Sequence, residues 1–166
     1  MGYTSFSNSA VLTGNPDEIW EAFAHPAISN LYAEHKVSFV PPEGFTPTPG
    51  QSWEEHHGDE CDYDKVSWNI THLVEQSVLE FRGKQTGVLQ RVQLRMEPAE
   101  NRYRLTETIH FSPTTGGKVG SSIFAWLLLG TGVLAKMSND KGQTFELLQD
   151  YLTNGAENTA PGESNK

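Results

Sequence analysis

The sequence predicts one α+β domain, in which a curved antiparallel sheet of about seven strands packs against two short helices and a long C-terminal helix. Two observations predict it. Residues 65–111 contain four successive stretches of alternating apolar and polar residues separated by short turns, the pattern of an antiparallel meander with one buried face. Residues 121–152 carry apolar residues at steps of three and four, the pattern of an amphipathic helix. This helix supplies the apolar cover that the buried face requires.

The first third of the chain supplies a strand and two short helices. Residues 3–12 predict the strand, because apolar residues recur on one face of it. Asn15 is a good N-cap and Pro16 suits the first helical position, so a helix follows and ends before His25-Pro26. The next segments are a second short helix, a strand, a proline-rich loop and another strand, over residues 27–33, 35–40, 41–50 and 51–57.

The rest of the chain is the meander, the closing helix and a tail. The strands of the meander are predicted over residues 65–74, 78–82, 88–96 and 103–111. Gly130, Gly132 and Gly142 each weaken the closing helix by about 1 kcal/mol relative to alanine, so we expect a bend or a break. We expect the folded domain to span residues 1–152, and the tail 153–166 to be disordered because it lacks large apolar residues.

Composition and charge narrow the classes of partner. The chain has 166 residues, enough for one folded domain. Twenty-one acidic against twelve basic residues give a net charge of −9, which argues against nucleic acid or an anionic membrane surface as a partner. No secretory signal is recognisable, and the longest apolar run, residues 123–129, is too short for membrane insertion. The single Cys61 fits a reducing compartment, so we expect a cytoplasmic protein; the sequence does not indicate its oligomeric state.

Four local features resemble a known superfamily. They are the entry into the first helix (Asn15-Pro16-Asp17-Glu18-Ile19-Trp20), Pro49-Gly50 before the third strand, the meander from Val66 to Phe111, and the end of the last helix at 145–152. Together they cover about residues 3–152 and resemble the helix-grip fold of the SRPBCC, or START-like, superfamily. The resemblance implies a cavity between the sheet and the last helix, with the two short helices and the proline-rich loop at its mouth.

Two polar residues stand out on strand faces that should be apolar. Glu107 lies between inward-facing apolar residues, where a carboxylate must be paired, protonated or wetted by a cavity. It either orients a ligand or acts as a general acid or base, unless it is hydrogen-bonded near the end of the sheet. His72 shares a face with Trp68 and Ile70, and could shuttle a proton or be a satisfied core histidine. Glu107 and His72 are therefore the catalytic candidates.

Other residues are candidates for lining the cavity. Lys141 lies in the helix stripe and could pair with Glu107 or with an anionic head group, unless Gly142 changes the phase of the helix. Glu55 and His57 face inward if Trp53 does. The further candidates are Trp53, Trp68, Phe81, Gln90, Tyr103 and Met137. The stretch 54–64 is rich in acids and contains two histidines and Cys61, but adjacent histidines on a strand point to opposite faces, so no metal site is predicted.

These observations leave three functions open. The leading hypothesis is binding or transport of a hydrophobic small molecule, such as a lipid, an isoprenoid or a polyketide, without a cofactor. The first alternative is a cofactor-independent polyketide aromatase/cyclase or dehydratase that uses acid–base residues in the cavity. The second is a regulatory module that binds protein through the outer face of the sheet. Two titratable groups within hydrogen-bond reach in an open cavity would favour the enzyme.

Overall fold

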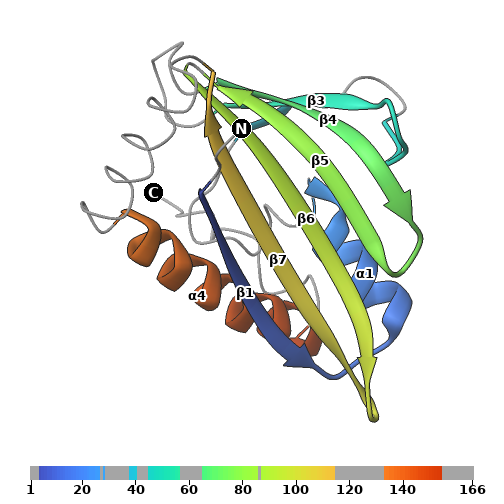
Figure 1. The fold of residues 1–166 in the computed structure, drawn as a ribbon. Coiled ribbons are helices and arrows are strands. Elements are labelled where there is room, and N and C mark those ends of the chain that lie inside the picture. Colours follow the sequence, from blue (N-terminus) through green and yellow to red (C-terminus); the bar gives the residue numbers. More distant parts are fainter. Residues whose placement is uncertain are drawn as a thin grey trace, which may run out of the picture.

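The computed structural model describes residues 4–26, 28, 38–40, 45–56, 65–85, 87–114 and 133–154. Seven strands form one antiparallel sheet in the order β1-β7-β6-β5-β4-β3-β2. Figure 1 shows the curved sheet with helix α4 (Val133–Asn154) passing beside β1, and with helix α1 (Pro16–Ala24) near the opposite half of the sheet. Both helices contribute residues to the same core as the inner face of the sheet. The predicted fold class is therefore confirmed.

Strand β1 and helix α1 form where the sequence predicts them. Strand β1 (Thr4–Leu12) pairs along its whole length with β7 (Arg102–Pro113). At the start of α1, the Asn15 side chain accepts a hydrogen bond from the backbone N–H of Asp17 at 2.9 Å, as an N-cap does. Ala24 is the last residue of the helix.

The other strands follow the predicted meander with adjusted ends. They are β2 (Ser38–Val40), β3 (Ser52–His56), β4 (Lys65–Val74), β5 (Val78–Gln85) and β6 (Val88–Ala99). Strands β5 and β6 run further than predicted. Gly83, which was expected in a turn, lies inside β5 under the Trp68 ring. Pro98 lies inside β6, beyond the point where β5 stops pairing with it, so its missing N–H removes no hydrogen bond on that side.

A β-bulge interrupts the pairing of β4 with β5. Ile70 pairs with Phe81 and His72 pairs with Glu80, so Thr71 is an extra residue on β4. The extra residue reverses the alternation of faces: His72 is exposed, whereas Leu73 points inward and is half-buried. The prediction that His72 shares the inner face with Trp68 is therefore wrong, because the period-two pattern does not continue through the bulge.

Helix α4 closes the core over β1 and α1. Phe145 and Leu148 are buried in the part of α4 whose side chains the structure describes, and the centre of the Phe145 ring lies 6.0 Å from that of Phe23 on α1. The helix continues through Gly142 and ends at Asn154, two residues beyond the predicted boundary. The predicted helical segment 121–132 and the predicted helix 27–33 fall wholly or largely outside the described residues. No helix in the described ranges is long and apolar enough to cross a membrane.

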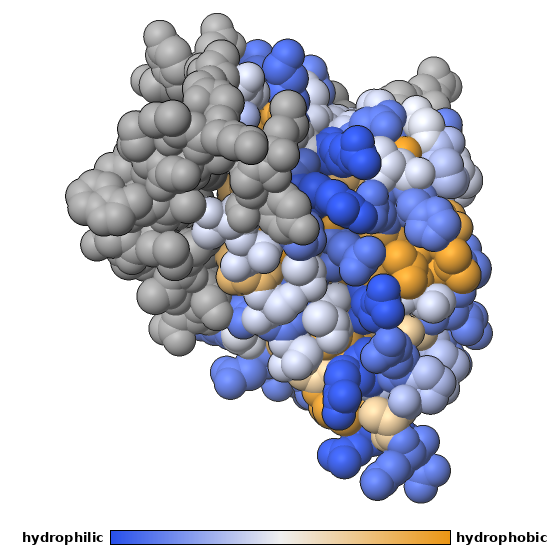
Figure 2. All heavy atoms as spheres, in the orientation of Figure 1, coloured by the Kyte–Doolittle hydropathy of each residue, from blue (hydrophilic) through white to orange (hydrophobic). Residues whose placement is uncertain are grey.

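The surface over the strands is mainly polar. In Figure 2 hydrophilic residues cover most of the visible strands, and apolar residues gather towards the end of the β4–β5 hairpin. Val74, at the end of β4, is 47% exposed. Its exposure is a direct consequence of the bulge, which turns it away from the core.

Gly142 provides a test of the unbroken helix. It is exposed, and a Cβ atom added there would meet nothing within 4 Å. Gly142→Ala is therefore expected to raise the free energy of unfolding by about 0.5–1 kcal/mol, because alanine loses less conformational entropy in a helix. Urea unfolding followed by circular dichroism measures this. A lower midpoint in the variant would contradict a helix that continues through residue 142.

Candidate functional site

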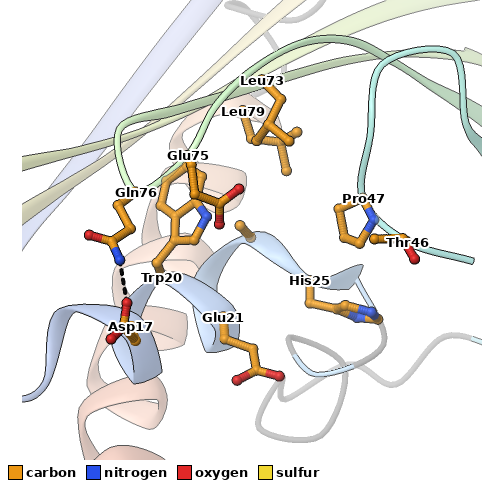
Figure 3. A pocket seen from close by; sticks show the side chains of 11 residues that line it. Asp17, Trp20, Glu21, His25, Thr46, Pro47, Leu73, Glu75, Gln76 and Leu79 are labelled. Carbon is orange, nitrogen blue, oxygen red and sulfur yellow. Dashed lines mark hydrogen bonds between the residues drawn. The ribbon is translucent and has the colours of Figure 1, made fainter.

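An open cleft lies between α1, the loop before β3 and the β4–β5 hairpin. Its volume is about 340 Å³. Figure 3 shows α1 on one side, Thr46 and Pro47 of the loop on the second, and Leu73, Leu79, Glu75 and Gln76 of the hairpin on the third. The cleft thus joins three segments that are distant in the sequence.

One stripe of helix α1 forms the first wall. From α1 the cleft is lined by Asp17, Trp20, Glu21 and Ala24, and by His25, which is the C-cap residue of the helix. Their spacing places them on one side of a helix. Trp20 and Ala24 are buried, whereas the carboxylates of this stripe are exposed at the rim.

The β4–β5 hairpin forms the apolar floor. Leu73 and Leu79 are cross-strand partners on the inner face, and Leu79 is fully buried. Gln76, in the turn, has a left-handed backbone with φ 53°, and its side-chain amide donates a hydrogen bond to the Asp17 carboxylate. This contact ties the hairpin to α1 across one end of the cleft (Figure 3).

The electrostatic character of the cleft is negative. Asp17, Glu21 and Glu75 are at its rim, and the lining residues that the structure describes include no lysine or arginine. Burial lowers the pKa of His25, and the nearby Glu21 carboxylate opposes this shift without cancelling it. His25 is therefore neutral at pH 7, and the rim retains its negative charge.

A row of aromatic rings runs from the cleft onto the inner face of the sheet. The ring centres of His25 and Phe45 lie 5.9 Å apart, and those of Phe45 and Trp53 lie 5.8 Å apart. Both pairs are T-shaped. The Trp53 and Trp68 rings are stacked, with their centres 6.1 Å apart. The Phe81 ring is in a T-shaped arrangement with both, and its centre lies 5.3 Å from that of Trp53 and 5.1 Å from that of Trp68. These rings give the region beside the cleft a continuous apolar wall.

The indole N–H groups of this wall differ in their partners. Trp53 Nε1 donates a hydrogen bond to the Glu55 carboxylate at 3.2 Å. Trp68 Nε1 is buried, and no residue in the part of the chain that the structure describes accepts a hydrogen bond from it. Buried donors are almost always paired, so Trp68 is a donor that a ligand acceptor could satisfy.

The predicted cavity residues divide into three groups. Trp53, Trp68 and Phe81 form the aromatic wall with Glu55 at its edge. Gln90, Tyr103 and Glu107 are half-buried on the inner face of β6 and β7, where Glu107 pairs with Asn8 on one side and Leu94 on the other. His57 lies outside the described residues, as do the side chains of Met137 and Lys141 on α4.

The two catalytic candidates are not brought together. Glu107 lies on the inner face of β7, whereas His72 lies on the outer face of β4 beside Glu80. A sheet therefore separates them, so they cannot act as an acid–base pair on one bound molecule.

None of the eleven residues that line the cleft in the described part of the chain was among the predicted site residues. The signal that could have found them is the α1 stripe, in which Trp20 and Ala24 are flanked by Asp17, Glu21 and His25 at helical spacing. The stripe alone does not show that a cleft remains between α1 and the hairpin. The resemblance, however, placed the two short helices and the proline-rich loop at the mouth of a cavity, and α1 together with Thr46 and Pro47 of that loop lines the cleft.

Comparisons with known proteins identify the fold. No family model matches the sequence, and no curated protein is significantly similar to it. Among solved structures, Ara h 8.0201 matches with a TM-score of 0.66 and 12% identity, over 93% of this chain and 100% of that one. A protein from Rhodobacter sphaeroides matches with a TM-score of 0.66 and 14% identity, over 91% and 93% of the two chains.

DynU16, a protein in the dynemicin biosynthetic locus, matches with a TM-score of 0.56 and 19% identity, over 90% of this chain but 47% of that one. At these identities the likeness concerns the fold and does not assign an activity. The chain has an SRPBCC-like, helix-grip fold.

Proposed function

We propose that this protein binds a small, mainly apolar molecule in the cleft between α1 and the β4–β5 hairpin. The observation that carries the proposal is the cleft itself: about 340 Å³, with an apolar floor of Leu73, Leu79 and Trp20 under a rim of polar side chains. Small-molecule sites commonly have this form, because the apolar floor supplies affinity and the few polar groups fix the orientation.

The charge of the rim favours neutral or cationic ligands. Asp17, Glu21 and Glu75 surround the opening, and His25 is neutral at pH 7. A carboxylate or phosphate brought to this rim would meet like charge, and no lysine or arginine among the described lining residues offsets it. We therefore propose a ligand with an apolar body and no negative charge, such as an isoprenoid or a neutral polyketide rather than a fatty acid.

The inner face of the sheet extends the proposed site. Trp53, Trp68 and Phe81 form an apolar wall beside the cleft, and we propose that the Trp68 N–H, which has no acceptor among the described residues, donates to an acceptor on the ligand. Gln90 and Glu107 are the polar groups deeper on the same face that we propose to contact the ligand. The cyclase alternative loses one of its catalytic candidates, because His72 lies on the outer face of the sheet, whereas Glu107 lies on the inner face.

A pair of adjacent leucine and valine residues tests the cleft. Leu73 lines it, whereas Val74 is the next residue along β4 and is 47% exposed. Leu73→Ala is expected to weaken the binding of Nile red, a neutral apolar dye, by about tenfold, because it removes apolar contact surface from the floor. Val74→Ala is the matched control and should leave the dissociation constant unchanged. Fluorescence titration measures both.

The same titration tests the charge preference. The anionic dye 8-anilinonaphthalene-1-sulfonate should bind more weakly than Nile red. Glu21→Gln removes one negative charge from the rim, so it should reduce the difference between the dissociation constants of the two dyes. Equal loss of Nile red binding in Leu73→Ala and Val74→Ala, or no binding to the wild-type protein, would contradict the proposed site. Native mass spectrometry of the protein purified from cells would then show whether another molecule is retained.

A further inference from the structure

A buried carboxylate lies on the outer face of the sheet, on the strand that forms the floor of the cleft. Glu80 is 8% exposed, and it faces outward because its neighbours Leu79 and Phe81 face inward. Its carboxylate accepts a hydrogen bond from Arg91 on β6. The Thr71 hydroxyl lies 3.1 Å from the same carboxylate and 3.2 Å from the backbone carbonyl of Glu80. A carboxylate buried on a solvent-facing surface is therefore held by two partners from neighbouring strands.

Thr71 is also the extra residue of the β-bulge. Before the bulge, Ile70 faces inward with its partner Phe81; after it, Leu73 faces inward with its partner Leu79. If Thr71 took a regular place in the ladder and no bulge formed, His72 would turn inward and Leu73 outward, because side chains alternate with a period of two. Leu73 lines the cleft only because Thr71 is accommodated on the outer face.

The side-chain contacts explain how the bulge is accommodated. A bulged residue leaves the ladder locally disrupted, and a side chain that hydrogen-bonds to the partner strand can restore the connection. The Thr71 hydroxyl reaches the backbone and the carboxylate of Glu80, the residue that pairs with His72 immediately after the bulge. Arg91 in turn fixes the carboxylate from the other side of β5.

From these contacts we infer that Thr71, Glu80 and Arg91 are positioning residues for the cleft. They hold the bulge on the outer face of β4 and β5, and the bulge places Leu73 in the floor of the cleft on the inner face. The effect on ligand binding rests on the proposed function, whereas the effect on the direction of Leu73 does not.

The charges around Glu80 fit a fixed, ionised group. Burial acts to raise the pKa of Glu80, but the hydrogen bond and charge of Arg91, the Thr71 hydroxyl and the charge of Arg82 together outweigh it and lower the pKa. Burial and the Arg91 charge lower the pKa of His110 on β7, against the attraction of Glu80, so His110 adds no competing positive charge at neutral pH. The Glu80 carboxylate therefore stays available to Thr71 and Arg91.

Cysteine labelling can report the direction of each β4 side chain separately. The native Cys61 is replaced by serine, and Leu73→Cys or His72→Cys is introduced in that background. Alkylation by iodoacetamide should be slower at position 73 than at the exposed position 72. Thr71→Val, which removes only the hydroxyl, should speed labelling at position 73 about fivefold, as expected for the loss of one hydrogen bond. Thr71→Ser should restore the protection.

A second threonine supplies the control for this labelling. Thr108 contacts the Ser7 hydroxyl on the same outer face, between β7 and β1 and away from the bulge. Thr108→Val should leave the labelling rates at positions 72 and 73 unchanged. Glu80→Gln, which keeps the shape but not the charge, should increase labelling at position 73 in the same direction as Thr71→Val.

Deletion of Thr71 tests the role of the extra residue directly. Without Thr71, His72 follows Ile70 in a regular ladder, and the alternation of side chains alone keeps position 72 outward and position 73 inward. The deletion variant should therefore keep position 73 protected and retain Nile red binding, and Glu80→Gln should no longer speed labelling at position 73 in it. If the deletion variant does not fold, Thr71→Val and Glu80→Gln decide. Unchanged labelling at position 73 in both of these folded variants would overturn the inference. If wild-type protein fails to bind the dye, the proposed function fails, while the labelling ratio still decides the positioning role.

Discussion

Trp68→Ala is expected to lower the free energy of unfolding by about 3–5 kcal/mol, because it removes a large side chain from a packed site. Trp68 is buried between Trp53 and Phe81, whose ring centres lie 6.1 and 5.1 Å away. Gly83, on β5, lies directly under the indole, and a Cβ atom there would come within 3.0 Å of three of its ring atoms. The glycine therefore provides the space that the indole occupies.

This arrangement predicts a strong coupling between the two positions. Gly83→Ala alone is expected to cost about 1–3 kcal/mol, since the strand backbone and the flanking rings limit movement of the indole. In the Trp68→Ala background the same substitution should be neutral or slightly stabilising, because the atoms it would meet are gone. The double variant should thus be more stable than the sum of the single effects by about 1–3 kcal/mol.

Chemical denaturation of the four proteins measures this cycle, with the far-ultraviolet circular dichroism signal as the probe. Gly142→Ala is the matched control, because the added methyl group there meets nothing within 4 Å. Additive costs at positions 68 and 83 would show that the indole does not rest on Gly83.

The fold could be predicted from the sequence because each strand has one buried face and one solvent-exposed face. In β6 the apolar residues Val92, Leu94 and Met96 lie two positions apart and alternate with polar residues, and the observed burial follows the same alternation. The start of α1 was predictable for a local reason, since Asn15 and Pro16 act through the backbone of their own segment. Both kinds of signal are contained within a few consecutive residues.

The bulge could not be predicted in the same way. His72 and Val74 continue the alternation of Val66, Trp68 and Ile70, so the sequence gives no local reason to place them on the outer face. The deciding contact is between the Thr71 hydroxyl and Glu80, which belong to different strands. The face of His72 was predicted wrongly because the contact at the bulge joins two strands, and a pattern within one strand does not reveal it.

The cleft escaped prediction for a related reason. Its residues come from α1, the loop at 46–47 and the β4–β5 hairpin, and each segment by itself resembles an ordinary amphipathic surface. Only the packing of α1 against the hairpin, supported by the contact of Gln76 with Asp17, leaves space between them. A pattern of apolar residues predicts which side chains avoid water, but it does not predict where packing stays incomplete.

Leu148→Ala is expected to lower the free energy of unfolding by about 2–5 kcal/mol, with the exact cost set by how far the site collapses. Leu148 is 1% exposed and lies in the face of α4 that covers the core. The neighbouring Leu147 is only half-buried, so Leu147→Ala is the matched control and should cost clearly less. Both substitutions have the same effect on helix propensity, so their difference isolates the packing of α4 against the core. Urea unfolding of the two variants measures that difference. Equal costs would contradict the face of α4 assigned to the core, and with it the helix as the cover of the sheet's inner face.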